Sequence, residues 1–270
     1  MSGEPRPPHA AVLRRPEQFQ PGAVAAVLAR RAKAPALDFI GPARRNWGVI
    51  AEALPAEEAQ ALAAELSCAG LDAAAIPQSL LESPPEAELV SKIELSGDGL
   101  DVVSGPANLA PARLSWTRLA ALCAAALETR DKKSIVEGPN LGAKAARLGL
   151  ALATGMPLPL GGGEKKRIVE TRDRVLRLDM VFLNPARTLR IEAERFDYSV
   201  LGERMLHGAE VNFALLLAEL AARAPRALRG RGTRAVLERR PSAERLYDSL
   251  DDLGREERWL ATLAALGGAS

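Results

Sequence analysis

The stretch WGVIAEALPAEEAQALAAELSCAGLDAAAIP, residues 47–77, decides the fold of the first part of this chain. Its central portion, residues 55–70, predicts a helix, because Pro55 suits the first helical position and Gly70 suits the residue after the last turn. Two glutamates follow the proline, where the positive end of the helix dipole favours acidic side chains. The apolar face of this helix comprises Ala59, Leu62, Ala63 and Leu66.

Short apolar runs on either side of this helix are typical of strands. Residues 47–54 precede the helix, and residues 71–76 follow it and end at Pro77. Three further elements are expected upstream: a strand over residues 10–14, a helix over residues 22–33, and a helix over residues 36–45 that is interrupted at Gly41-Pro42. The whole order predicts a small βααβαβ module over residues 10–77.

This order of elements resembles the C-terminal domain of the bacterial ribosomal stalk protein. The segments that carry the resemblance are AAVLRRP, GAVAAVLARRAK, ALDFIGPARR, WGVIAEAL, PAEEAQALAAELSCAG and LDAAAIP, in that order. The resemblance implies the fold of that domain. In that family the second helix carries lysines that recruit translation factors, whereas the matching stretch here has Phe39, Ile40 and Pro42, so that role is not implied.

A linker over residues 78–88, with Pro84-Pro85 inside it, precedes a part of the chain that is dominated by strand patterns. KIELSGDGLDVV, residues 92–103, predicts a hairpin around its Gly-Asp-Gly turn. The strongest strand pair is VLRLDMVFL and TLRIEAERF, which the turn signal Asn184-Pro185-Ala186-Arg187 joins. An amphipathic helix is expected over residues 205–224.

Residues 88–224 resemble the bacterial pleckstrin-homology-like fold. The segments that carry this resemblance are GLDVV, LSWTRLAAL, VLRLDMVFLNPARTLRI and the helix that begins near His207. The resemblance implies a mostly antiparallel β module over residues 89–224 that the amphipathic helix closes, and it names no ligand. Residues 134–166 have no place in that pattern and are expected to form an inserted loop and short helix.

The last part of the chain, residues 225–270, is expected to be a helical tail in two pieces. Ser242 is the predicted N-cap of the first piece, and Leu253-Gly254 predicts a break between the two. The apolar side of the second piece comprises Trp259, Leu260 and Leu263. Taken together, these elements predict an α+β protein.

The composition is that of an ordinary globular protein, with 47% hydrophobic and 26% charged residues among 270. A net charge of +2 does not indicate a polyanion partner for the whole chain. Residues 1–9 lack the apolar core of a signal peptide and are expected to be a disordered leader. The best apolar stretch, residues 148–160, is shorter than a membrane span. We therefore expect a cytoplasmic protein without membrane insertion.

Few residues suit metal or cofactor chemistry. The two histidines are His9 and His207, and the sequence contains no Cys-x-x-Cys, His-x-x-x-His or Asp-x-Asp motif. Cys68 and Cys123 lie in apolar stretches, which predicts buried thiols. We expect neither a metal nor a cofactor.

A glycine run, Gly161-Gly162-Gly163, is followed by Lys165 and Lys166 and could hold a phosphate through backbone amides. It lacks the preceding strand and the following Ser or Thr of a phosphate-binding loop, so an ordinary loop is favoured.

The stretch FDYSVLGERMLHG, residues 196–208, contains a candidate corner site of Asp197, Tyr198, Glu203 and His207. General acid–base catalysis needs a histidine and a carboxylate in contact, and on a helix Glu203 and His207 would lie one turn apart. The favoured alternative is a strand-to-helix corner in which Tyr198 packs, Asp197 caps a turn and the charged side chains are solvated.

A run of arginines, ARAPRALRGRGTRAVLERR, follows at residues 222–240. Its candidate polyanion-binding residues are Arg226, Arg229, Arg231 and Arg234. Such a run could bind nucleic acid by releasing counterions, but no aromatic side chain interleaves with it to stack on bases. A solvated connector is the favoured reading.

Three functions follow from these observations. The leading one is a non-enzymatic binding or adaptor protein with an unidentified protein partner, because no group of titratable residues converges. The alternative is a protein associated with nucleic acid through the arginine run. The third is a small enzyme centred on Glu203 and His207.

Overall fold

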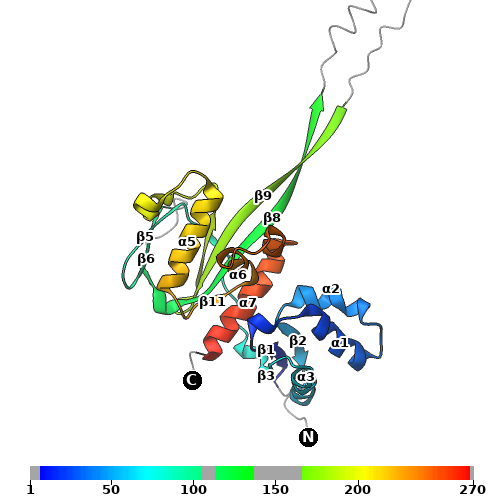
Figure 1. The fold of residues 1–270 in the computed structure, drawn as a ribbon. Coiled ribbons are helices and arrows are strands. Elements are labelled where there is room, and N and C mark those ends of the chain that lie inside the picture. Colours follow the sequence, from blue (N-terminus) through cyan, green and yellow to red (C-terminus); the bar gives the residue numbers. More distant parts are fainter. Residues whose placement is uncertain (1–6, 105–112, 137–165, 268–270) are drawn as a thin grey trace, which may run out of the picture. The chain divides into compact units, whose positions relative to one another are not determined.

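A computed structural model describes residues 7–104, 113–136 and 166–267 (Figure 1). Its contacts divide the chain into two compact units. The larger unit comprises Met1–Leu127 and Val175–Ser270, and the smaller one comprises Glu128–Arg174. The two antiparallel sheets, the helices packed on them and the C-terminal helix confirm the α+β prediction.

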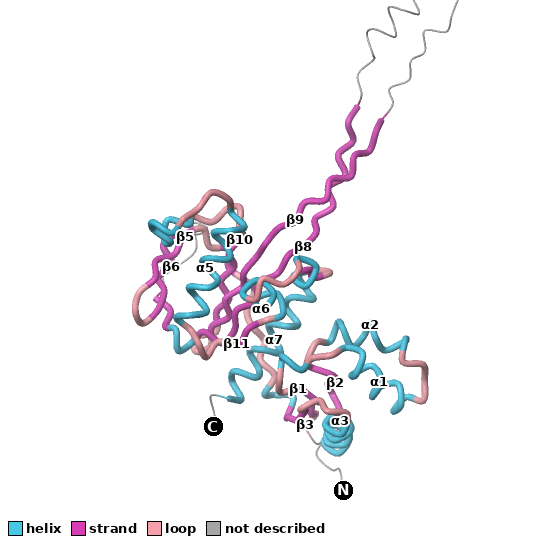
Figure 2. Tube along the Cα trace, in the orientation of Figure 1, coloured by secondary structure: helices cyan, strands magenta, loops and turns pink. Residues whose placement is uncertain are grey.

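The βααβαβ order predicted for the N-terminal module is confirmed (Figure 2). Its elements are β1 (His9–Leu13), α1 (Pro21–Ala32), α2 (Leu37–Asn46), β2 (Val49–Leu54), α3 (Ala56–Cys68) and β3 (Ala73–Pro77). The strands form an antiparallel sheet in the order β2-β1-β3. Residues 10–13 of the central strand are fully buried, so β1 forms the middle of this core.

Helix α3 lies within the predicted range but begins at Ala56, one residue after the expected first position, and ends at Cys68. Pro55 is its N-cap residue, two glutamates lie in the first turn, and Gly70 follows with a positive φ of 83°. Leu62 and Leu66 are buried against the sheet, at 2% and 0% exposure. The apolar face predicted from the sequence is therefore confirmed.

We expect Leu66→Ala to lower the free energy of unfolding by about 2–5 kcal/mol, because it removes a fully buried leucine and leaves a cavity. Glu58→Ala changes an exposed side chain of the same helix and should cost less than about 1 kcal/mol. Urea denaturation followed by circular dichroism measures both values. Equal losses from the two variants would contradict the assignment of the buried face.

The predicted interruption of the second helix is wrong. Pro42 lies inside α2, which is continuous from Leu37 to Asn46. A proline at this position removes one main-chain hydrogen bond, and the packing of α2 against α1 keeps the helix intact.

The later strands form two further sheets. The first has the order β11-β8-β9-β10-β4, with β12 paired to β8, and the second has the order β5-β6-β7. Their strands are β4 (Glu88–Leu89), β5 (Lys92–Leu95), β6 (Gly99–Ser104), β7 (Arg113–Ser115), β8 (Leu119–Val136), β9 (Lys166–Phe182), β10 (Arg187–Glu192), β11 (Leu228–Arg229) and β12 (Leu246–Tyr247). The hairpin of β5 with β6 and the antiparallel pair of β9 with β10 confirm the two strongest strand predictions.

Helices cover both faces of the β8–β9–β10 sheet. Helix α5 (Ala209–Arg223) packs its buried side chains with Leu178, Met180 and Phe182 on one face. Helix α7 (Leu250–Gly267) packs with Cys123 and Val181 on the other face. This alternation along β9 follows from the period of two in a strand.

The expected insertion at residues 134–166 lies mostly outside the described residues. Ser134–Val136 continue β8 and Lys166 begins β9, so the ends of the insertion are strands instead of a loop. The segment expected to be a linker, residues 78–88, makes specific contacts: the backbone N–H of Glu82 donates to Oγ1 of Thr262 on α7 (2.9 Å).

The tail differs from the two-piece prediction. Besides α7 it contains β11, helix α6 (Arg231–Leu237) and β12. Pro241, and not Ser242 as predicted, is the N-cap residue of a short 3-10 helix, Ser242–Arg245. Gly254 does not break α7. An interior glycine costs a helix about 1 kcal/mol, and the burial of Leu253, Trp259 and Leu260 on this helix outweighs that cost.

Trp259 connects α7 with the N-terminal sheet. Its indole Nε1 donates to the carbonyl oxygen of Leu13 (2.7 Å), and its ring lies directly on Gly48. Trp47 makes a second connection, because its Nε1 donates to Oδ1 of Asp252 (2.7 Å). The N-terminal module and the tail therefore share one core within the larger unit.

Candidate binding site beside strand β2

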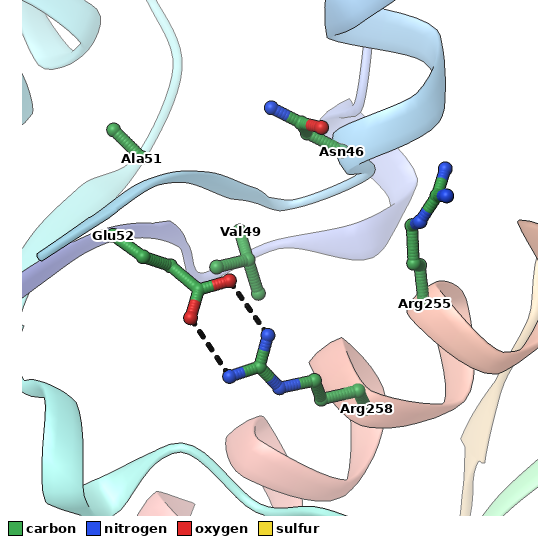
Figure 3. Close-up of a pocket in the computed structure, with 6 residues that line it drawn as sticks. All are labelled: Asn46, Val49, Ala51, Glu52, Arg255 and Arg258. Atoms are coloured by element: carbon green, nitrogen blue, oxygen red, sulfur yellow. Dashed lines mark hydrogen bonds and ion pairs between the residues drawn. The ribbon is translucent and has the colours of Figure 1, made fainter.

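A pocket of about 300 Å³ lies between β2, the end of α2 and α7 (Figure 3). We call it the β2–α7 pocket, and it is lined by Asn46, Val49, Ala51, Glu52, Arg255 and Arg258. Asn46 is the last residue of α2, and the two arginines lie three residues apart on α7, so both project from the same side of that helix.

The position of β2 leaves room for this pocket. Among the described strands, β2 pairs with β1 only, so it is an edge strand of its sheet. Trp47 has a positive φ of 49° between α2 and β2, which turns the chain sharply and brings Asn46 close to the start of the strand. The contact of Trp259 with Gly48 holds α7 alongside.

One side of the pocket is closed by an ion pair. The guanidinium of Arg258 donates two hydrogen bonds to the carboxylate of Glu52, at 2.6 and 2.8 Å (Figure 3). Such partly exposed pairs contribute about 0–1 kcal/mol to stability. The pair neutralises Glu52 and fixes both side chains in one geometry.

Arg255 supplies the remaining charge. Its Nη1 donates to the carbonyl oxygen of Arg45 (3.2 Å), and no carboxylate of the described residues lies within ion-pair distance of its guanidinium. Nδ2 of Asn46 makes one long hydrogen bond to the carbonyl oxygen of Ile50 (3.5 Å). The pocket therefore offers a guanidinium and an amide to a carboxylate or another anion.

A second group of ionisable residues is buried between α7 and the sheet, and two of its members, Glu256 and Glu257, belong to α7. Asp179 on β9 accepts hydrogen bonds from Arg190, which lies opposite it on β10. Burial and the neighbouring charge of Asp179 raise the pKa of Glu257 to about 10. Burial also raises the pKa of Glu256, whose carboxylate accepts from the backbone N–H of Arg231 (2.7 Å) and from the hydroxyl of Tyr247 (2.5 Å).

Two of these groups, Glu256 and Glu257, connect α7 with Arg231, Tyr247 and Asp179. Asp179 and Glu256 have 0% and 1% exposure, so their polar contacts lie inside the core. Within the described ranges, no group of three or more His, Cys, Asp or Glu side chains could hold a metal ion.

The four residues of the predicted corner site do not converge. Asp197 caps a 3-10 helix, Tyr198–Arg204, by accepting from the backbone N–H of Ser199 (2.9 Å). That hydrogen bond and the contact with Lys92 lower the pKa of Asp197. The buried hydroxyl of Tyr198 donates to the carbonyl oxygen of Ala193 (2.9 Å).

Glu203 and His207 are exposed, and the helix on which they were expected to meet is absent. Glu203 lies in the 3-10 helix, whereas His207 lies in a bend before α5, which begins at Ala209. The physical reason lies between the two residues, because Met205, which ends the 3-10 helix, has an extended backbone (φ −65°, ψ 130°).

The structure separates the four candidate arginines into two pairs. Arg226 and Arg229 are exposed. Arg231 places its guanidinium over the rings of Trp47 (5.1 Å) and Tyr247 (4.7 Å) and donates to the carbonyl oxygen of Leu246. Arg234 donates to the carbonyl oxygens of Arg229 and Pro16. The second pair therefore serves the fold.

The remaining sequence candidates have mixed outcomes. Gly161–Gly163 and Lys165 lie outside the described residues. Cys123 is buried, and burial raises the pKa of its thiol, whereas Cys68 is exposed, so the prediction of two buried thiols is half wrong. Cys68 is the last residue of α3 and projects from the side of the helix that faces solvent.

No protein-family model, no curated protein and no solved structure matches this chain. The resemblances to the stalk-protein domain and to the pleckstrin-homology-like fold therefore stay predictions. Among the described helices, none alone is long and apolar enough to cross a membrane, although the bent pair Tyr198–Arg204 and Ala209–Arg223 together has that length and composition.

Proposed function

We propose that this chain is a non-enzymatic binding protein that holds an extended, acidic segment of a partner protein along the edge of β2. The observation that carries the proposal is the guanidinium of Arg255, which faces a pocket at an edge strand without a carboxylate partner among the described residues. We place this function in the cytoplasm.

An edge strand is a natural acceptor for an extended peptide, because the peptide backbone can hydrogen-bond along the unpaired side. Side chains of the added strand would then alternate, with every second one directed into the adjacent pocket. A cavity of about 300 Å³ suits one or two such side chains. The guanidinium of Arg255 and the amide of Asn46 select a carboxylate there.

The ion pair of Glu52 with Arg258 supports the same choice of ligand. Without Arg258, the carboxylate of Glu52 would repel an acidic segment. With both hydrogen bonds in place, the pair is neutral, and Arg255 decides the charge preference of the pocket.

Arg255→Ala is expected to weaken the binding of a fluorescein-labelled peptide of alternating valine and glutamate by about tenfold or more, because a hydrogen bond to a charged group contributes about 1.5–3 kcal/mol. Fluorescence anisotropy measures the affinity. A peptide with lysine in place of glutamate should bind weakly to both proteins.

Arg226→Ala is the matched control, because it removes the same charge from an exposed arginine outside the pocket. It should leave the affinity for the acidic peptide unchanged. Absence of binding by the acidic peptide, or equal losses from the two variants, would contradict the proposal.

Nucleic-acid binding through the arginine run is the alternative, and the exposure of Arg226 and Arg229 is the observation in its favour. A labelled single-stranded RNA in the same assay tests it, with Arg226→Ala and Arg229→Ala combined. Arg231 and Arg234 are left intact in this test, because their replacement would also disturb the core contacts described above.

A further inference from the structure

A small group of exposed apolar side chains lies just before helix α5 and in its first turn. Met205, Leu206 and Val211 expose 52%, 56% and 46% of their surface, although all three are large and apolar. We call these three residues the apolar knob. Neighbouring exposed side chains of this kind are uncommon on monomeric proteins and mark interaction surfaces.

Asn212 fixes the backbone of the knob. Its Oδ1 accepts from the backbone N–H of Leu206 (2.8 Å), and its Nδ2 donates to the carbonyl oxygen of the same residue (2.7 Å). The side chain of Asn212 is 5% exposed, so both bonds are shielded from water. A second tie is the hydrogen bond from the backbone N–H of Met205 to the carbonyl oxygen of Gly202 (3.1 Å). The knob is therefore presented in one conformation before it meets a partner, which lowers the entropic cost of binding.

The same chain has an open groove with an apolar floor at the corner of α1 and α2. It is wide open to solvent and is lined by Ala26, Ala29, Arg30, Lys33, Ala34, Pro35 and Ala36. Alanine and proline make up most of this lining, so the floor is shallow and can receive a larger apolar side chain. Leu37, which follows the last of these residues, is 79% exposed.

The charges beside the knob and the groove are complementary. The groove carries Arg30 and Lys33, and neither has a carboxylate partner among the described residues. Beside the knob, Glu203 is the exposed carboxylate that remains to face these cations, because Glu210 is already in an ion pair. Two nearby cations are already engaged, because Arg204 pairs with Glu219 (2.9 Å) and Arg245 pairs with Glu210 (3.0 Å).

We propose that the apolar knob of one copy of this chain docks in the α1–α2 groove of a second copy. The two surfaces differ, so the contact is heterologous and each copy keeps one knob and one groove for further neighbours. Such a contact builds rings or open chains of subunits. The proposal is independent of the β2–α7 pocket, because it uses none of the residues that line it.

Sedimentation velocity over a range from micromolar to millimolar concentration tests the assembly. We expect the full chain to form oligomers that grow with concentration. Leu206→Asp should remain monomeric, because it places a charge at the centre of the knob, and Ala26→Arg should remain monomeric, because it fills the groove from an exposed helical position. Leu80→Asp changes an exposed leucine elsewhere and should assemble like the wild type.

Mixing the two monomeric variants gives the sharper result. Leu206→Asp retains an intact groove and Ala26→Arg retains an intact knob, so an equimolar mixture should form 1:1 dimers and nothing larger. Circular dichroism confirms that each variant is folded. A wild type that stays monomeric at all concentrations, assembly that survives either substitution, or a mixture that stays monomeric would each overturn the proposal.

Discussion

Trp259→Ala will lower the free energy of unfolding by about 3–5 kcal/mol, the largest loss that we expect from truncating a single side chain of this protein. The ring is 1% exposed, and its Nε1 donates to the carbonyl oxygen of Leu13. Its ring also packs against that of Phe19 in a T-shaped arrangement, with 5.7 Å between centroids. The substitution removes all of these contacts at once. Urea denaturation measures the loss of stability, followed by the circular dichroism of the backbone, because tryptophan fluorescence would change with the substitution itself.

Gly48→Ala tests the same contact from the opposite side. A Cβ at this position would lie 1.7 Å from Cε2 of Trp259, so the ring or the backbone must move. Overpacking of this kind costs about 1–3 kcal/mol or more. In the Trp259→Ala background, Gly48→Ala should cost much less stability, because the ring that it would clash with is absent. The difference between the costs of Gly48→Ala in the two backgrounds is the coupling energy of the pair.

Gly22→Ala is the matched control for this cycle, because no atom lies within 4 Å of the Cβ it would add. It should be neutral or slightly stabilising in both backgrounds. Additive losses from Gly48→Ala and Trp259→Ala would mean that the two residues do not share a contact.

The sequence predicts the elements whose signals are local. Helix α3 has its proline, acidic first turn, apolar face and terminal glycine within residues 55–70, and every one of these signals concerns the same few turns of chain. The pair of β9 and β10 is equally local, because alternation and a turn signal between them suffice. Agreement between such signals is why these elements could be predicted, although β9 (Lys166–Phe182) begins before the run VLRLDMVFL and β10 (Arg187–Glu192) ends before the run TLRIEAERF does.

The errors concern residues whose conformation depends on distant partners. Gly254 is a helix breaker by local rules, but it lies inside α7 because residues on both sides of it pack into the core. Arg231 belongs to the arginine run, which was predicted to be solvated. Its guanidinium instead lies over the ring of Trp47, a residue of the N-terminal module. No local pattern indicates either contact.

The candidate site is a stronger example of the same limit. Asn46, Glu52 and Arg255 come from α2, β2 and α7, and no motif or spacing connects them in the sequence. A weak signal existed in α7, where Arg255 and Arg258 share one side of a helix whose apolar side was predicted. The pocket depends on the packing of Trp259 on Gly48, which sequence reasoning did not foresee.

Glu257→Gln is expected to make the protein more stable than the wild type at neutral and alkaline pH. Glu257 lies on the buried side of α7 beside Asp179, and burial first and the charge of Asp179 second raise its pKa to about 10. One of its oxygens, Oε1, has no hydrogen-bond partner in the described structure. The folded protein therefore keeps a proton on this carboxyl, which hydrogen-bonds to Asp179.

The direction of the pH effect follows from proton linkage. An unfolded glutamate releases its proton near its usual pKa of 4.5, whereas the folded one keeps it until about 10. Between these two values the folded state binds more protons than the unfolded state, so the free energy of unfolding falls as the pH rises, with a limiting slope of about 1.4 kcal/mol per pH unit for one proton. The loss of stability that Glu257 causes is absent below about pH 4.5 and complete above about pH 10.

Glutamine mimics the protonated carboxyl, because its amide donates to Asp179 and carries no charge to titrate. Urea denaturation at several values between about pH 5 and pH 9 should therefore give a flatter pH dependence for Glu257→Gln than for the wild type. The other ionisable groups that face this position are the same in both proteins: Glu256 on the same helix, Cys123 on β8, Asp179 on β9 and Arg190 on β10. Glu58→Gln removes the same charge from an exposed glutamate on α3. It should leave the slope of the free energy of unfolding against pH as in the wild type. Parallel pH profiles for Glu257→Gln and the wild type would show that Glu257 is ionised in the folded state and would contradict the prediction.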